Sequence, residues 1–165
     1  MAVPFVSFVG RSGSGKTTLL VKVVRALARK GYRVGTVKHF RHEFETDRPG
    51  KDSYRHFHAG AAASMIASGK KLALVKRLPR PLSLRRIVSA HFPDMDLVVA
   101  EGFKGEPGPK IEVLRRAVSR EPVCPPRGGG LLALVCDFAV PGYPQPRLRS
   151  GEARKIVRLI EKEIL

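Results

Sequence analysis

Gly10-Arg-Ser-Gly-Ser-Gly-Lys16-Thr17 is the stretch that decides the fold of this chain. It matches the pattern G-x-x-x-x-G-K-[ST], in which backbone N–H groups cradle phosphates. The apolar residues 2–9 before it predict a buried parallel strand, and the spacing of apolar residues over 16–30 predicts a helix that stops at Gly31. Because strand, glycine-rich loop and helix follow in the order that a phosphate-binding loop requires, we predict nucleotide binding.

The rest of the chain continues to alternate between strand-like and helix-like segments. Strands are predicted over residues 32–39, 64–67, 72–75, 95–100, 110–114 and 131–137, and helices over 52–60, after Ser83 and over 151–165. This alternation is typical of an α/β protein. We therefore predict a three-layer P-loop NTPase fold with a mostly parallel central sheet flanked by helices. Without an internal repeat or a convincing linker, residues 1–165 are expected to form a single P-loop nucleotide-binding domain.

The residue types of the loop suit a nucleotide triphosphate with Mg²⁺. Glycines let the loop backbone curl around phosphates, and the following helix adds the positive end of its dipole. Lys16 is expected to reach the β- and γ-phosphate oxygens, and the Thr17 hydroxyl to ligate Mg²⁺. The predicted nucleotide-binding residues are Gly10, Ser12, Gly13, Ser14, Gly15, Lys16, Thr17, Thr18 and Asp137. For Asp137 two interpretations stay open, an acceptor for guanine N1–H and N2–H, or a turn residue before Pro141.

Two carboxylates are candidates for chemistry at the γ-phosphate. Glu101 ends an apolar strand, where P-loop folds place an acid that holds Mg²⁺ directly or through water. Asp96, at the other end of that strand, is interpreted as a solvated boundary residue. Asp52 is either a helix N-cap or a second acid that faces the metal and the attacking water. The predicted metal ligands are Thr17 and Glu101, and the predicted catalytic residues are Asp52 and Glu101.

A polar segment over residues 40–51 follows the second predicted strand. His39 and His42 lie at its start, but the segment lacks the helical H-E-x-x-H frame of a catalytic zinc site. Imidazole and basic groups in such a loop suit an anionic ligand close to the γ-phosphate. We therefore interpret His39 and His42 as ligand-loop residues.

Composition and charge narrow the classes of partner. The chain has 31 Lys and Arg against 14 Asp and Glu, a formal net charge of +17, which favours anionic partners. The chain has neither a block of like charges nor aromatic residues interleaved with basic ones, so a nucleic-acid partner is disfavoured. The chain contains no Asn, so the N-K-x-D guanine motif of Ras-like GTPases is excluded. No apolar stretch approaches the ~18 residues that a membrane-spanning helix requires, and neither a basic leader nor a C-x-x-C pair is present, so we expect a cytoplasmic protein without a membrane span.

Several segments taken together carry a family resemblance. They are the P-loop, Val37-Lys-His39-Phe-Arg-His42, Phe44-Glu-Thr-Asp47-Arg-Pro49-Gly-Lys-Asp52-Ser53, Asp96-Leu-Val-Val-Ala-Glu101-Gly-Phe-Lys104 and Pro109-Lys-Ile-Glu-Val113. With these segments the chain resembles the molybdopterin-guanine dinucleotide biosynthesis protein B family, MobB, over residues 3–137. The Pro-Gly-Lys-Asp-Ser and Glu-Gly-Phe-Lys segments are far more specific than the P-loop, which many unrelated proteins share.

The resemblance implies a GTP-binding accessory protein and a homodimer with weak Mg²⁺-dependent GTPase activity. Such a protein assists the molybdenum cofactor guanylyltransferase that attaches GMP to molybdopterin, and molybdopterin itself is a further candidate ligand. By the same resemblance the loop glycines, Lys16 and Thr17 hold phosphates, and Glu101 serves the metal. Asp47, Lys51 and Asp52 then line the neighbouring loop. The implied cofactors are GTP and Mg²⁺.

Two other functions are consistent with the P-loop. In a P-loop small-metabolite kinase that uses ATP, Asp52 would be the base, His39 or Arg41 would position the acceptor hydroxyl, and turnover would need no partner. A metallochaperone GTPase of nickel enzymes is less favoured, because no Cys-Pro-His motif or His-rich tail is present. The accessory function predicts slow hydrolysis, since Gln145 is the only Gln and no Gln lies near the P-loop in sequence. Whether the chain is an enzyme stays open, and we expect at most a weak GTPase that acts as an accessory protein.

Overall fold

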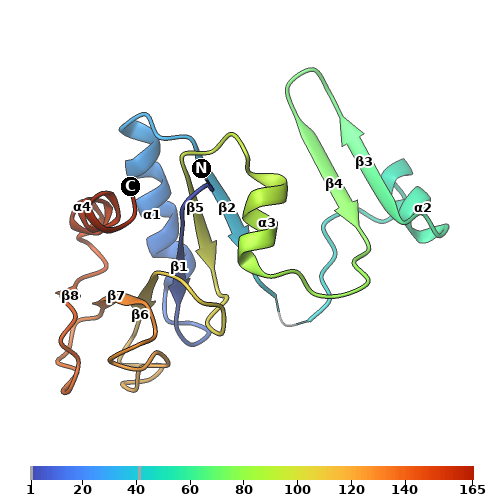
Figure 1. The fold of residues 1–165 in the computed structure, drawn as a ribbon. Helices are drawn as coiled ribbons and strands as arrows, with labels where there is room; N and C mark the ends of the chain where they lie inside the picture. The colour runs from blue at the N-terminus through green and yellow to red at the C-terminus, as the bar shows by residue number, and fades with distance from the viewer. Residues whose placement is uncertain (1, 41) are drawn as a thin grey trace. The chain divides into compact units, whose positions relative to one another are not determined.

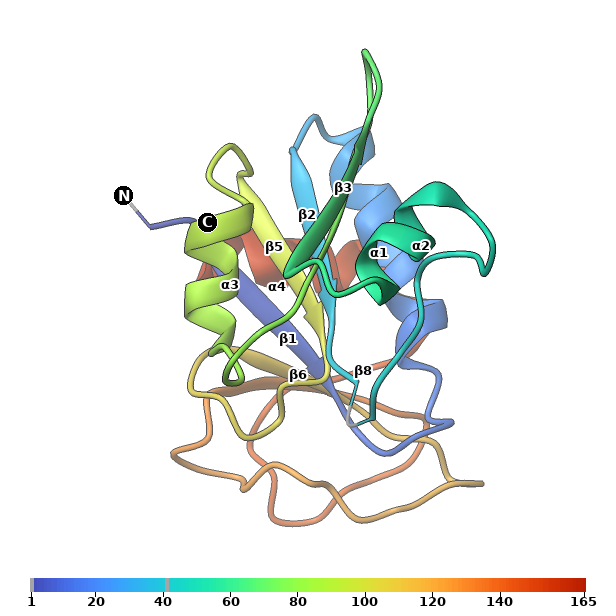
Figure 2. The ribbon, with the colours of Figure 1, turned by 90° about the vertical axis from the view of Figure 1, so that its right-hand side faces the viewer.

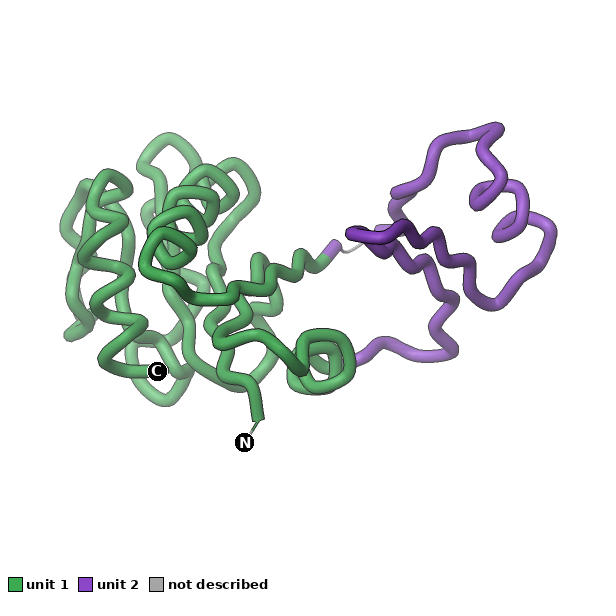
Figure 3. Tube along the Cα trace, turned by 90° about the horizontal axis from the view of Figure 1, so that it is seen from above, with its two compact units in different colours: residues 1–39, 83–165 green, residues 40–82 purple. Residues whose placement is uncertain are grey.

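A computed structural model describes residues 2–40 and 42–165. The chain divides into two compact units, residues 1–39 with 83–165, and residues 40–82, which Figure 3 shows in different colours. The assignment of residues 1–165 to a single domain stays a prediction. No helix in the described part of the chain is long and apolar enough to cross a membrane.

The larger unit is built on a six-stranded sheet (Figure 1). Its strands are β1 (Phe5–Val9), β2 (Val34–Lys38), β5 (Leu97–Glu101), β6 (Lys110–Val113), β7 (Leu131–Val135) and β8 (Arg147–Leu148), and its helices are α1 (Lys16–Arg29), α3 (Leu84–His91) and α4 (Ala153–Glu163). The strands lie in the order β2-β5-β1-β6-β7-β8, and every neighbouring pair is parallel. The predicted α/β class with a mostly parallel sheet is confirmed.

Alternation of side chains along the buried strands produces three layers. Val6 and Phe8 point to the face of the sheet that α1 and α4 cover. Phe5 and Val98 pack with α3 on the opposite face. Figures 1 and 2 show α1 and α4 on one side of the sheet and α3 on the other. Because both faces are covered by helices, the central strands are apolar at almost every position.

The strand order brings several loops together at one edge of the sheet. β1 lies between β5 and β6, and all three strands run in the same direction. The loop after β1 is the P-loop, and it therefore emerges beside the carboxyl ends of β5 and β6. In open parallel sheets ligands bind at this edge, where the chain turns to opposite sides of a central strand.

The smaller unit contains α2 (Asp52–His58) and an antiparallel hairpin of β3 (Ala63–Ala67) and β4 (Leu72–Lys76). At the hairpin turn the Ser68 hydroxyl accepts a hydrogen bond from the Lys71 N–H at 3.2 Å. The guanidinium of Arg77 lies 4.3 Å from the centre of the Phe57 ring and also donates to the Phe57 carbonyl at 3.1 Å. These contacts tie the hairpin to α2.

All predicted helices and strands occur, with ends that shift by a few residues. Ser83 caps α3 as expected, since its hydroxyl accepts a hydrogen bond from the Arg86 N–H at 3.3 Å. The last helix is shorter than the predicted 151–165. β8 was not predicted, because it has only two residues and lies in a proline-rich stretch.

Candidate functional site

Three glycines give the P-loop its shape. Gly10, Gly13 and Gly15 have φ angles of 137°, 76° and 90°, in the region that favours glycine. A Cβ atom on Gly10 would lie 2.3 Å from the Val113 carbonyl oxygen, so the loop also requires glycine for its close approach to β6. The pattern that predicted a curled backbone therefore has a direct structural cause.

The first turn of α1 has backbone N–H groups without a side-chain cap. Gly15 occupies the N-cap position in a left-handed conformation, and the first turn contains no acidic residue. The Lys16 ammonium folds back and donates to the Arg11 carbonyl at 2.8 Å. Burial lowers the pKa of Lys16, Lys38 acts in the same direction, and Glu101 opposes them. Free helix N–H groups beside a lysine are an arrangement that binds phosphate.

Thr17 and Glu101, the two predicted metal ligands, are in contact. The Thr17 hydroxyl lies 2.9 Å from each carboxylate oxygen of Glu101, which is only 9% exposed. A hydroxyl and a carboxylate are hard oxygen donors of the kind that Mg²⁺ prefers. The residues present therefore fit the metal that the sequence predicts.

Lys38 also belongs to this group, although the sequence analysis did not select it. Its ammonium lies 3.4 Å from Glu101 Oε1. β2 pairs with β5 so that Lys38 lies opposite Glu101. Only the strand register reveals this contact, and the sequence signal was limited to a lysine at the end of a predicted strand.

A cavity of about 720 Å³ opens beside the P-loop. Its lining includes Ser14, Gly15, Thr18, Lys22, Arg115, Asp137, Arg149 and Glu152. Asp137 follows β7, and Arg149 follows β8, so the cavity collects the loops after neighbouring strands. Ser14 Oγ is buried and has no hydrogen-bond partner among the described residues. The volume lies within the range of small-molecule sites, and the P-loop forms one wall.

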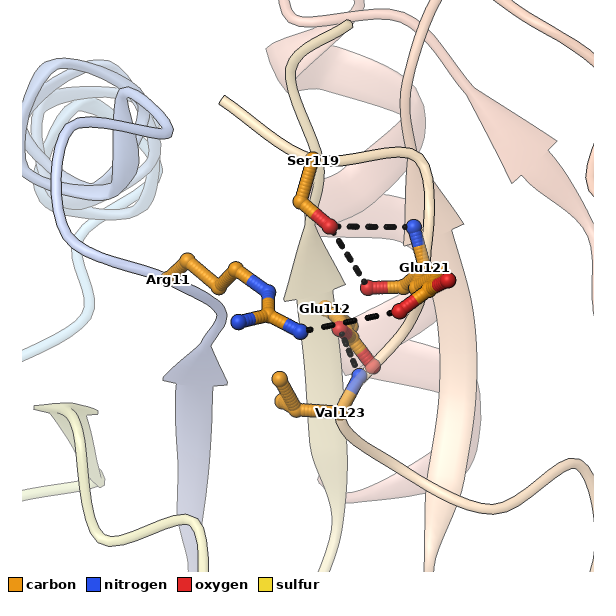
Figure 4. Close-up of polar contacts among 5 residues, drawn as sticks. All are labelled: Arg11, Glu112, Ser119, Glu121 and Val123. Atoms are coloured by element: carbon orange, nitrogen blue, oxygen red, sulfur yellow. Dashed lines mark hydrogen bonds and ion pairs between the residues drawn. The ribbon is translucent and has the colours of Figure 1, made fainter.

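A loop after β6 is fastened next to the P-loop (Figure 4). Glu112 is 1% exposed, and its carboxylate accepts hydrogen bonds from the Val123 N–H at 2.6 Å and the Cys124 N–H at 2.9 Å. Arg11 of the P-loop lies 3.9 Å from the Glu121 carboxylate. The sequence analysis missed Glu112, although a carboxylate inside an apolar strand was a visible signal.

Cys124 is chemically quiet in this setting. Its thiol is buried, and burial, followed by the neighbouring Glu112 carboxylate, raises its pKa to about 12. Cys136 is also buried and free, and burial raises its pKa as well. A raised pKa lowers the fraction of thiolate, which is the reactive form, so burial disfavours nucleophilic chemistry at both cysteines.

His39 has a structural role in the larger unit. Its backbone N–H donates to the Glu101 carbonyl at 2.9 Å, and the centre of its ring lies 4.9 Å from the centre of the Phe103 ring. Gly102, with a φ of 97°, passes so close that a Cβ atom there would lie 3.1 Å from the His39 Cβ. His39 therefore holds the turn that follows Glu101, and its role toward a ligand stays a prediction.

The other ligand-loop residues belong to the smaller unit. Lys51 is the N-cap of α2 and Asp52 its first residue, so the N-cap interpretation of Asp52 is wrong. A hydrogen bond from Ser53, then one from the Arg48 N–H, lowers the pKa of Asp47. The roles of His42, Asp47, Lys51 and Asp52 beside the γ-phosphate stay predictions. Arg41 lies outside the described residues.

Comparison with known proteins gives a consistent result. The family model described as molybdopterin guanine dinucleotide synthesis protein B, MobB, matches residues 5–137. The chain is 40% identical to a molybdopterin-guanine dinucleotide biosynthesis adapter protein of Escherichia coli strain K12. The match extends over 123 residues, which cover 73% of this chain and 70% of that protein. A protein of the same name from Haemophilus influenzae is 38% identical over 119 residues, covering 72% of this chain and 67% of the relative.

Solved structures agree with the sequence comparison. A crystal structure of molybdopterin-guanine biosynthesis protein B superposes with a TM-score of 0.73 at 31% identity, over 96% of this chain and 98% of that one. The crystal structure of Bacillus subtilis MobB gives a TM-score of 0.75 at 26% identity, over 98% of both chains.

Proposed function

This chain belongs to the MobB family, and from that premise we propose that it is an adapter protein of molybdopterin guanine dinucleotide biosynthesis that binds GTP with Mg²⁺. The adapter function follows from the names of its relatives. The observation that carries the nucleotide part is the contact of Thr17 with Glu101 at 2.9 Å, at the start of a P-loop helix.

The phosphates of GTP would lie against the P-loop. The uncapped N–H groups of α1 face that position, and Lys16 can exchange the Arg11 carbonyl for phosphate oxygens. Thr17 and Glu101 would hold Mg²⁺, which when bound neutralises charge on the phosphate oxygens. Lys38, at 3.4 Å from Glu101, orients that carboxylate from the neighbouring strand.

The guanine base would occupy the cavity beside the P-loop. Asp137 lines this cavity after β7, and a carboxylate only accepts hydrogen bonds. Guanine offers donors at N1 and N2, whereas adenine carries an acceptor at N1. This difference supports a preference for GTP over ATP.

Hydrolysis is expected to be weak. Fast GTPases orient the attacking water with a Gln, but Gln145 lies in the loop before β8, where its side chain donates to the Pro126 carbonyl at 2.6 Å. An adapter of this kind presents a nucleotide or senses it, and a partner enzyme performs the transfer. We propose the molybdenum cofactor guanylyltransferase as that partner.

The hairpin of the smaller unit supports a homodimer. Met65, Leu72 and Leu74 are 54%, 65% and 39% exposed, and the register places them on one face. A two-stranded hairpin is marginally stable alone, and its unpaired edges accept further strands. A second copy of the chain offers the same apolar face, so we propose that the hairpins of two copies pair.

The transfer reaction tests this function. GMP transfer to molybdopterin by purified guanylyltransferase is measured with and without the chain and GTP, and phosphate release is measured in parallel. The adapter function predicts faster or more complete transfer with slow phosphate release. Partner-free turnover of ATP on an added metabolite would instead identify a kinase.

A further inference from the structure

A groove of about 570 Å³ runs between α1 and α4. Cationic side chains form its walls: Lys22, Arg25, Arg29, Arg154 and Lys155. All five are exposed. The groove shares Lys22, Gly151 and Glu152 with the nucleotide cavity, so the two sites are adjacent.

The positive charge of the groove is largely uncompensated. Glu152 is the only acid in its lining, and it already accepts hydrogen bonds from the Lys155 ammonium and the Arg149 N–H. In residues 2–40 and 42–165, no carboxylate lies within ion-pair distance of Lys22, Arg25 or Arg29. These three residues are spaced three and four apart on α1, where like charges repel one another. An anionic partner would relieve that repulsion.

The groove rests on a rigid base. Leu27 of α1 belongs to the same buried cluster as Ile156 and Ile160 of α4. Lys30 and Glu161 form an ion pair that joins the two helices at their surface. Because the helices are fixed relative to one another, the backbone positions that carry these cations are already in place, and binding would need to order only side chains.

We propose that this groove docks an acidic segment, rich in Asp and Glu, of a partner protein. The inference rests on the proposed adapter function, which requires a partner, and it specifies that the docking surface of this partner is acidic. Arginine guanidinium groups match carboxylates in two-pronged contacts. No aromatic side chain lines the groove for base stacking, which disfavours single-stranded nucleic acid. A partner docked here would contact the nucleotide cavity through the shared residues.

The test compares two charge-matched double variants. Arg25→Glu with Arg29→Glu reverses the groove, and Arg85→Glu with Arg86→Glu reverses an equal charge on the exposed face of α3. Binding of a fluorescent Glu-rich peptide to the full chain is measured by anisotropy at about 0.1 M salt, where distant charges are screened. The same samples are titrated with single-stranded RNA, with GTP and with the purified guanylyltransferase.

The groove variant should bind the peptide and the transferase about tenfold more weakly than the parent, and the α3 variant within about twofold, while both bind GTP like the parent. Equal losses in both variants would overturn the proposal, because affinity would then follow net charge alone. An intact affinity of the groove variant, or a groove dependence seen with RNA and not with peptide, would also overturn it. A parent protein that fails to bind GTP would refute the proposed function, whereas the peptide comparison would still decide the docking site.

Discussion

Glu101 receives side chains from two elements that are distant in sequence. Thr17 reaches it from α1 and Lys38 from β2, and the sheet register fixes both contacts. These contacts support the proposed Mg²⁺ site, because they set the orientation of the carboxylate before a cation arrives.

Glu101→Gln removes the charge and keeps a hydrogen-bond acceptor for Thr17. We expect the Mg²⁺-dependent gain in GTP affinity to fall by about 10- to 100-fold, and binding without Mg²⁺ to change little. Calorimetric titration with and without Mg²⁺ measures both quantities. Glu106→Gln, in the loop after β5, is the control. A Mg²⁺ effect that survives Glu101→Gln would contradict the metal assignment.

Gly10 is required by space as well as by its φ angle. In Gly10→Ala the new Cβ would lie 2.3 Å from a β6 carbonyl, so backbone must shift. We expect a loss of about 1–3 kcal/mol in the free energy of unfolding, measured with denaturant. Gly105→Ala is the matched control, since nothing lies within 4 Å of its added Cβ. Equal stability of the two variants would disprove the packing argument.

At the scale of the elements, β6 and the loop behind it depend on Glu112. Its buried carboxylate accepts the N–H groups of Val123 and Cys124. Glu112→Ala leaves the buried Cys124 N–H and the part-buried Val123 N–H without their acceptor, at a cost of about 2–4 kcal/mol in the free energy of unfolding. The exposed pair of Arg11 with Glu121 is worth little, so Glu121→Ala should stay within about 0.5 kcal/mol. Denaturant unfolding measures the free energy of unfolding of both variants. Amide hydrogen exchange at Val123 should become faster in Glu112→Ala and stay unchanged in Glu121→Ala.

The elements also show what the sequence could and could not predict. Strands with continuous apolar residues and the helix after the P-loop were predictable, because burial on both sides leaves a clear pattern. The contact of Lys38 with Glu101 was not, because strand order and register depend on tertiary packing. β8 could not be predicted for a different reason, since a strand of two residues shows no periodicity. The P-loop pattern singled out Thr17, and the position at the end of an apolar strand singled out Glu101. The structure brings the two side chains into contact, and their role toward a metal stays a prediction.

At the scale of the whole molecule, the apolar hairpin predicts self-association. Met65→Lys with Leu72→Glu places opposite charges on its apolar face and leaves the net charge unchanged. We expect this variant to be monomeric by light scattering at concentrations where the parent is a dimer. Val21→Glu, a change at a 48% exposed apolar residue of α1, should leave the dimer intact. Retained GTP binding would show that the larger unit is still folded, and a dimeric hairpin variant would rule out pairing through this face.

Part of the excess of basic residues is concentrated at one place on the molecule. The five cations of the α1–α4 groove contribute to the net charge of +17, and this groove lies next to the nucleotide cavity. A nucleotide carries its own negative charge into that neighbourhood. Binding of GTP and docking of an acidic partner are therefore expected to influence one another through the shared residues.

The central claim is that the P-loop of this chain binds GTP with Mg²⁺, and calorimetric titration of the parent and of Lys16→Ala with GTP and with ATP tests it most directly. We predict that the parent binds GTP more tightly than ATP, and that Lys16→Ala weakens GTP binding by about 100-fold or more, since a charge-assisted contact to the phosphates is lost. Unchanged GTP affinity in Lys16→Ala, or no binding by the parent, would contradict the account.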